Sequence, residues 1–126
     1  MTTQEILKAA RGAKTAVALS DSGTRDSALL GMADALCAPE SMDAILAANA
    51  EDMAAAKGHI SDVMLDRLAL TPQRIEAMAK GIRDVAALPD PVGRVLSHIE
   101  RPNGLVIEKT AVPMGVIAII YESRPN

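Results

Sequence analysis

The most chemically suggestive stretch of the sequence is the polar segment Tyr121–Asn126, which directly follows the apolar run Val116–Ile120. A run of mostly β-branched residues is typical of a strand buried on both faces of a parallel sheet. The carboxyl ends of such strands form the edge at which open α/β sheets bind their ligands. At that edge Arg124 could hold a phosphate or carboxylate, Ser123 could donate a hydrogen bond, and Asn126 could donate its amide to an oxyanion. The same residue types also build turns, so both interpretations stay open here.

Three other side chains could in principle do chemistry. Cys37 shares helical spacing with Ala33 and Leu36, so we expect a buried structural thiol rather than a nucleophile. His59 follows an expected helix end and His98 begins an expected strand, and we interpret both as surface or loop residues. One cysteine and two histidines are too few for a structural zinc site, and no glycine-rich nucleotide-binding motif is present.

The composition indicates a globular chain with a thin core. Hydrophobic residues make up 49% and charged residues 23% of the 126 residues, with one Tyr and neither Phe nor Trp. Aromatic rings supply the largest single burials in most cores, so this core should pack shallowly, as helices laid over another layer do. The net charge of −3, with basic and acidic residues interspersed, disfavours nucleic-acid binding, which would show as a salt-dependent affinity. A single cysteine excludes an internal disulfide, and the absence of a signal peptide or a long apolar run predicts a cytoplasmic protein without a membrane segment.

Residues 1–94 are predicted to be helical. A capping box, Thr2 with Glu5, is predicted to open the first helix, and Pro39 and Pro72 are placed where proline is tolerated, at the first turn. Thr71 is a strong cap for the last helix, and Gly58 is a plausible left-handed helix end.

Residues 95–112 are predicted to form a β-hairpin. Two extended runs flank Pro102-Asn103-Gly104, and Asn-Gly between such runs is a strong hairpin signal because both residues tolerate positive φ. A two-stranded hairpin is marginally stable alone, so we expect it to pair with another strand or subunit.

Residues 113–126 are predicted to be the first strand and active-site loop of a sheet whose remaining strands are missing. A buried strand needs neighbours for its backbone donors and acceptors, and no other run of this kind occurs in the sequence. We therefore expect the sequence to have been cut within an α/β domain.

The run AVPMGVIAIIYESRPN at residues 111–126 resembles the γ-glutamyl phosphate reductases, a branch of the aldehyde dehydrogenase superfamily. Upstream, Ile45, Leu46, Ala48 and Asn49 resemble the family's early helix. The family is also similar at two later segments, DRLALT (residues 66–71) and LPDPVGRVL (residues 88–96). The resemblance covers the chain in order. It implies an aldehyde-dehydrogenase-like α/β fold, of which this chain holds the helical part of the cofactor-binding domain, the hairpin of an oligomerisation sheet and the first strand of the cofactor-binding sheet.

The resemblance also implies an activity for the parent enzyme. Such enzymes use NADPH to reduce L-glutamate 5-phosphate to L-glutamate 5-semialdehyde and phosphate in proline biosynthesis, through a cysteine that lies beyond these residues. It implies an oxyanion-stabilising role for Asn126, cofactor contacts for Tyr121 and Glu122, and substrate contacts for Ser123 and Arg124. It further implies a homo-oligomeric parent and, from the pathway, an association with glutamate 5-kinase.

A second reading stays open. The chain could be a non-catalytic helical interaction module that ends in an apolar segment. Such a module would have to cover Val116–Ile120 with its own helices.

Overall fold

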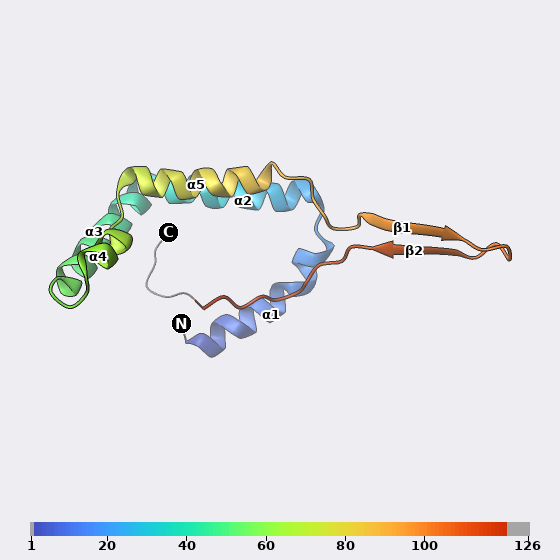
Figure 1. Cartoon of the computed structure of the whole chain (residues 1–126), viewed down its shortest axis with the longest axis horizontal. Helices are drawn as coiled ribbons and strands as arrows, with labels where there is room; N and C mark the ends of the chain where they lie inside the picture. The colour runs from blue at the N-terminus through green and yellow to red at the C-terminus, as the bar shows by residue number, and fades with distance from the viewer. Residues whose placement is uncertain (1, 121–126) are drawn as a thin grey trace. The chain divides into compact units, whose positions relative to one another are not determined.

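A computed structural model describes residues 2–120 of the chain. Five helices precede a two-stranded antiparallel sheet in this part of the chain (Figure 1). The elements are α1 (Thr3–Leu19), α2 (Ser22–Cys37), α3 (Pro39–Ala56), α4 (Asp62–Leu68), α5 (Pro72–Ala86), β1 (Val95–Glu100) and β2 (Val106–Thr110). They belong to two compact units: a helical unit of residues 23–87, and a hairpin unit in which α1 accompanies residues 88–118.

Local capping signals in the sequence place the helix starts. The Thr2 hydroxyl accepts a hydrogen bond from the Glu5 backbone N–H at 3.3 Å, while the Glu5 carboxylate accepts one from the Thr2 N–H at 2.7 Å. The predicted capping box is therefore confirmed. Thr71 caps α5 by accepting from the Arg74 N–H at 3.2 Å, with Pro72 in the first turn as expected.

The helix ends also follow the sequence signals. Ser20 ends α1, and its N–H donates to the Val17 carbonyl at 3.3 Å. Gly58, just beyond α3, has φ of 82°, the left-handed conformation predicted for it.

In the helical unit, Asn49 joins α3 to the connection between α4 and α5. Its side chain is nearly buried, at 8% exposure, in the interior of an alanine-rich helix. Its amide nitrogen donates to the Leu68 carbonyl at 3.0 Å, and its amide oxygen accepts from the Leu70 N–H at 2.7 Å. One side chain thus satisfies two backbone groups that lie between helices, where no helical partner exists.

Arg74 holds the same connection from the other side. Its guanidinium donates to the backbone carbonyls of Asp66 and Ala69, the latter at 2.7 Å, and forms an ion pair with the Asp66 carboxylate at 2.9 Å. Residues 66–70 are therefore held by a side chain from α3 and a side chain from α5. This arrangement fixes the bend that brings α5 back toward α3.

The core of the helical unit is as thin as the composition predicts. The fully buried apolar side chains in the described residues are Ala33 on α2 and Ile75 and Ala79 on α5. Figure 1 shows α5 running back along α2, and Arg83 on α5 bonds Asp34 on α2 at 2.7 Å. A core of so few and mostly small side chains buries little apolar area. Much of the apolar surface, including Val63 and Val85, is left exposed.

The hairpin forms as predicted, with its two strands on either side of Pro102-Asn103-Gly104. The Gly104 N–H donates to the Arg101 carbonyl, and the Arg101 N–H donates to the Leu105 carbonyl, both at 2.9 Å. Pro102 and Asn103 therefore occupy the centre of a turn, and Gly104 follows it with φ of 83°. Asn103 does not adopt positive φ, so of the Asn-Gly pair only the glycine uses the left-handed conformation that both residues tolerate. A three-residue loop needs one left-handed residue, and proline's fixed φ suits the first central position.

The strand predicted at Val116–Ile120 does not form in this structure. Residues 111–120 contain no strand or helix, and Val116, Ile117, Ile119 and Ile120 are all exposed. A strand is defined by hydrogen bonds to a neighbour, and the sheet in the described residues contains β1 and β2 alone. No helix among residues 2–120 is long and apolar enough to cross a membrane.

We predict that Asn49→Ala lowers the free energy of unfolding by about 2 kcal/mol, because it leaves the Leu68 carbonyl and the Leu70 N–H without their partner. Urea unfolding followed by circular dichroism measures the change. Glu51→Ala, exposed on the same helix, is the control and should change stability by less than about 0.5 kcal/mol. Equal stability of the two variants would contradict a structural role for the Asn49 amide.

Candidate functional site

The candidate site residues at the end of the sequence, Tyr121, Glu122, Ser123, Arg124 and Asn126, lie outside the described residues. The structure does describe the segment that leads to them. That segment leaves the hairpin where the Gly93 N–H donates to the Ala111 carbonyl and the Ala111 N–H donates to the Arg94 carbonyl, both at 2.9 Å. These two hydrogen bonds therefore fix where the chain leaves the hairpin and continues toward the candidate site residues.

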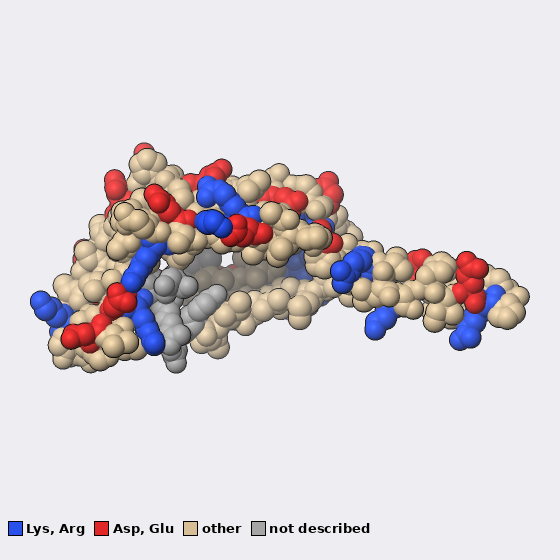
Figure 2. Space-filling model, turned by 45° about the horizontal axis from the view of Figure 1, so that its top comes forward, with Lys and Arg blue, Asp and Glu red and all other residues tan. Residues whose placement is uncertain are grey.

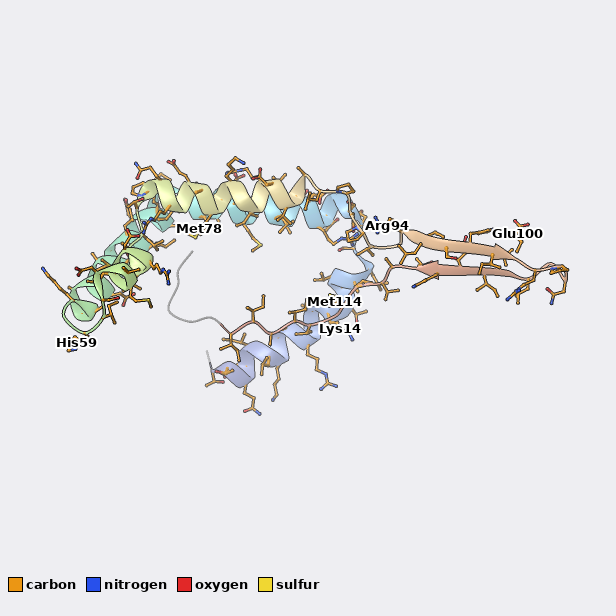
Figure 3. The ribbon with its side chains drawn as sticks, viewed as in Figure 1. Lys14, His59, Met78, Arg94, Glu100 and Met114 are labelled. Atoms are coloured by element: carbon orange, nitrogen blue, oxygen red, sulfur yellow. The ribbon has the colours of Figure 1, made fainter. Side chains whose placement is uncertain are left out.

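A glycine bend follows four residues later. Gly115 has φ of 91°, a conformation that costs any L side chain about 1–2 kcal/mol. A methyl group added at Gly115 would lie 3.3 Å from Cε and 3.8 Å from Nζ of Lys14 on α1. Figure 3 shows Lys14 close to the neighbouring Met114. The positive φ of Gly115 therefore produces a bend in the backbone just before the apolar run Val116–Ile120.

The hairpin carries a polar cluster around His98. Its ring Nδ1 lies 2.9 Å from a carboxylate oxygen of Glu108, directly across the sheet, and Nε2 lies 3.4 Å from Glu100. All three side chains are substantially exposed. Exposed charged pairs contribute roughly 0–1 kcal/mol, so we interpret the cluster as cross-strand support and not as a catalytic site. The expectation that His98 is a surface residue is confirmed, although it lies inside β1 and not at its start.

Cys37 lies half-buried at the end of α2, four residues after the buried Ala33. Its polar neighbour is Arg83, whose main partner is Asp34 at 2.7 Å. Asp34 raises the pKa of the Arg83 guanidinium above its ordinary value by accepting its hydrogen bond, and the Cys37 side chain adds to this effect. No histidine base is among these contacts.

His59 is exposed beyond α3, as expected (Figure 3). Within the described range, no group of three or more His, Cys, Asp or Glu side chains could hold a metal ion. In the view of Figure 2, acidic and basic side chains are interspersed over the helices and not gathered by sign. That distribution agrees with the mixed charge pattern of the sequence.

The best-organised polar contacts are those of Asn49 and Arg74, which sequence reasoning did not single out as a clamp. The available signal was an asparagine within the alanine-rich run Ile45–Ala50. Asparagine is disfavoured inside helices unless its amide has another partner. Both side chains bind backbone groups, so they position the helices.

Comparison with known proteins shows which enzymes the chain is similar to. No model of a protein family matches it. The γ-glutamyl phosphate reductases of Streptococcus pneumoniae strains Hungary19A-6 and D39 are each 58% identical to it over 123 residues, which is 98% of this chain and 29% of the relative. The crystal structure of the γ-glutamyl phosphate reductase of Thermotoga maritima matches with a TM-score of 0.81 at 32% identity, over 87% of this chain and 26% of that one. Sequence and fold both match the γ-glutamyl phosphate reductases.

The γ-glutamyl phosphate reductase of Saccharomyces cerevisiae agrees with this result. Its crystal structure matches with a TM-score of 0.76 at 36% identity, over 90% of this chain and 29% of that one. The resemblance inferred from the sequence is therefore confirmed. The chain spans less than a third of the length of these reductases.

We predict that the Cys37 thiol reacts more slowly with a disulfide reagent in the folded chain than in the chain unfolded in urea, because burial on α2 restricts access. The release of the reagent's chromophore measures both rates, and Cys37→Ala gives the background. A thiol that reacts faster in the folded chain would contradict the structural interpretation and indicate activation by its surroundings.

Proposed function

We propose that this chain is part of an NADPH-dependent enzyme that reduces L-glutamate 5-phosphate to L-glutamate 5-semialdehyde and phosphate in proline biosynthesis. The observation that carries the proposal is the 58% identity to γ-glutamyl phosphate reductase across 98% of the chain. Two solved γ-glutamyl phosphate reductases share the fold of these residues, which supports the same assignment.

In the proposed reaction a cysteine thiolate of the parent attacks the γ-acyl phosphate and forms a thioester as phosphate leaves. NADPH, when bound, would supply the hydride that reduces the thioester to the aldehyde, and the thiolate would be released unchanged. We do not assign the thiolate to Cys37, because the resemblance implies a cysteine beyond these residues and no histidine base is among the described contacts of Cys37. The thiolate is therefore expected from a part of the parent outside these residues.

The residues that we assign to the site are the polar ones at the end of the sequence. Asn126 is proposed to donate a hydrogen bond from its side-chain amide to the oxyanion. This hydrogen bond is stronger in the transition state than in the ground state. Tyr121 and Glu122 are proposed to contact the cofactor, and Ser123 and Arg124 the phosphate of the substrate. A guanidinium suits this last role because it can bond two phosphate oxygens at once.

The described part of the chain is proposed to contribute to assembly of the oligomer and to support the site. The hairpin exposes apolar side chains on its strands, among them Leu96, Ile99 and Ile107, and a two-stranded ribbon is marginal without further contacts. This supports a role in a homo-oligomer. A cytoplasmic location and an association with glutamate 5-kinase are proposed from the pathway alone.

The alternative function is a non-catalytic helical interaction module. It requires Val116–Ile120 to be covered by the chain's own helices. Ile117 is 62% and Ile120 97% exposed, so the structure does not supply that cover. The exposure counts against the module and favours partners elsewhere in a larger fold.

We predict that residues 1–126 alone do not oxidise NADPH with glutamate 5-phosphate, and that a chimera does. In the chimera these residues replace the corresponding segment of the S. pneumoniae reductase, to which they are 58% identical. Loss of NADPH absorbance measures both reactions. A folded chimera without activity would contradict the proposed function, and activity of residues 1–126 alone would contradict the placement of the thiolate elsewhere.

We predict that Asn126→Ala in the active chimera lowers kcat by about 10²–10³-fold with a small change in KM, because an oxyanion donor acts mainly in the transition state. Gln73→Ala removes an exposed amide on α5 and is the matched control. A rise in KM at unchanged kcat would instead assign Asn126 to substrate binding.

A further inference from the structure

The tip of the hairpin combines a reactive dipeptide with an open setting. Pro102, Asn103 and Gly104 are all exposed, and a methyl group added at Gly104 would meet nothing within 4 Å. Because glycine has no side chain, its backbone nitrogen can approach the side-chain carbonyl of the preceding asparagine without steric hindrance. Neither the proposed reduction nor the comparisons give this dipeptide a chemical role.

The hydrogen bonds of the turn bear directly on that approach. The Leu105 N–H donates to Asn103 Oδ1 at 3.2 Å, which folds the side-chain carbonyl back across Gly104 and polarises it. The Gly104 N–H donates to the Arg101 carbonyl at 2.9 Å and must be released before its nitrogen can attack. The tip of a two-stranded ribbon opens locally at small cost in free energy, so this release is frequent.

We propose that Asn103 is a site of spontaneous modification, at which the chain converts its own asparagine through a cyclic succinimide to aspartate and isoaspartate. Hydroxide removes the Gly104 amide proton, and the nitrogen bonds to Asn103 Cγ. The bond from Cγ to Nδ2 then breaks, and ammonia leaves with a proton from water. Water next adds to either carbonyl of the ring and opens it, with no change in oxidation state.

The two products affect the hairpin differently. Aspartate adds a negative charge beside Arg101 and keeps the backbone length. Isoaspartate adds one methylene to the backbone inside the loop that Gly104 and Leu105 close onto Arg101. The three-residue loop then no longer fits the register that pairs Glu100 with Val106.

The purified chain provides its own internal control. Trypsin releases residues 95–109 as one peptide, because cleavage before Pro102 is blocked, and Asn103 is its single asparagine. Residues 26–57 form a second peptide whose single asparagine is Asn49, which is followed by alanine and held by two hydrogen bonds. Incubation of the folded chain at mildly acidic and mildly alkaline pH, followed by mass spectrometry of both peptides, measures the conversion.

We expect the side-chain amide to be lost only in the peptide that contains Asn103, and to be lost faster at the alkaline pH. Isoaspartate should be the larger of the two products. Asn103→Gln should abolish it, because glutamine forms the corresponding larger ring far more slowly. Equal retention of Asn103 and Asn49 would overturn the proposal, as would conversion that appears only after unfolding in urea. Hydrogen exchange in residues 95–109 should be faster in the isoaspartate form than in Asn103→Asp, and equal exchange would overturn the effect on register.

Discussion

The helical unit depends on the two hydrogen bonds of Asn49. Residues 68–70 pass between α4 and α5, where the backbone has no helical partner, and the Asn49 amide satisfies one carbonyl and one N–H there. A core built on Ala33, Ile75 and Ala79 buries too little apolar area to fix this bend by itself. Hydrogen bonds from a buried amide are directional, whereas apolar packing is not. The two bonds of Asn49 therefore set the angle between α3 and α5 more than the thin core does.

The hairpin unit depends on a different constraint, the geometry of its loop. Pro102 and Gly104 supply the two backbone conformations that a three-residue loop needs, and the pairing of Ile99 with Ile107 follows from that loop. The strands have no buried side chain. A ribbon held mainly by its turn and its backbone bonds suits a segment that completes its packing on another surface. The exposed apolar side chains of residues 112–120 suggest the same of the segment that follows.

The thin core and the exposed apolar surface agree with the comparisons. The chain matches less than a third of the length of the γ-glutamyl phosphate reductases. In an α/β enzyme, helices of this kind cover a sheet, so their apolar faces need an opposing layer. We therefore interpret Val63, Val85 and the run Val116–Ile120 as surfaces shaped for that layer rather than as defects of packing.

The sequence by itself determined the features that depend on neighbouring residues. Capping by Thr2 and Thr71, the proline starts of α3 and α5, the left-handed Gly58 and the existence of the hairpin all follow from local chemistry. The family resemblance was also present in the sequence, because it rests on residue identities. Local signals did not settle the turn type, since Asn-Gly suits both a two-residue loop and the loop found, and the preceding proline favours the latter.

Only the tertiary structure decided the contacts between residues far apart in the chain. The bonds of Asn49 to Leu68 and Leu70, and of Arg83 to Asp34, join distant segments that no local pattern relates. The run Val116–Ile120 also shows that a local pattern does not decide tertiary contacts. Its composition favours a strand, but a strand exists only where a neighbour accepts and donates its hydrogen bonds. In the described part of this chain no neighbour pairs with it, so propensity alone could not make it a strand.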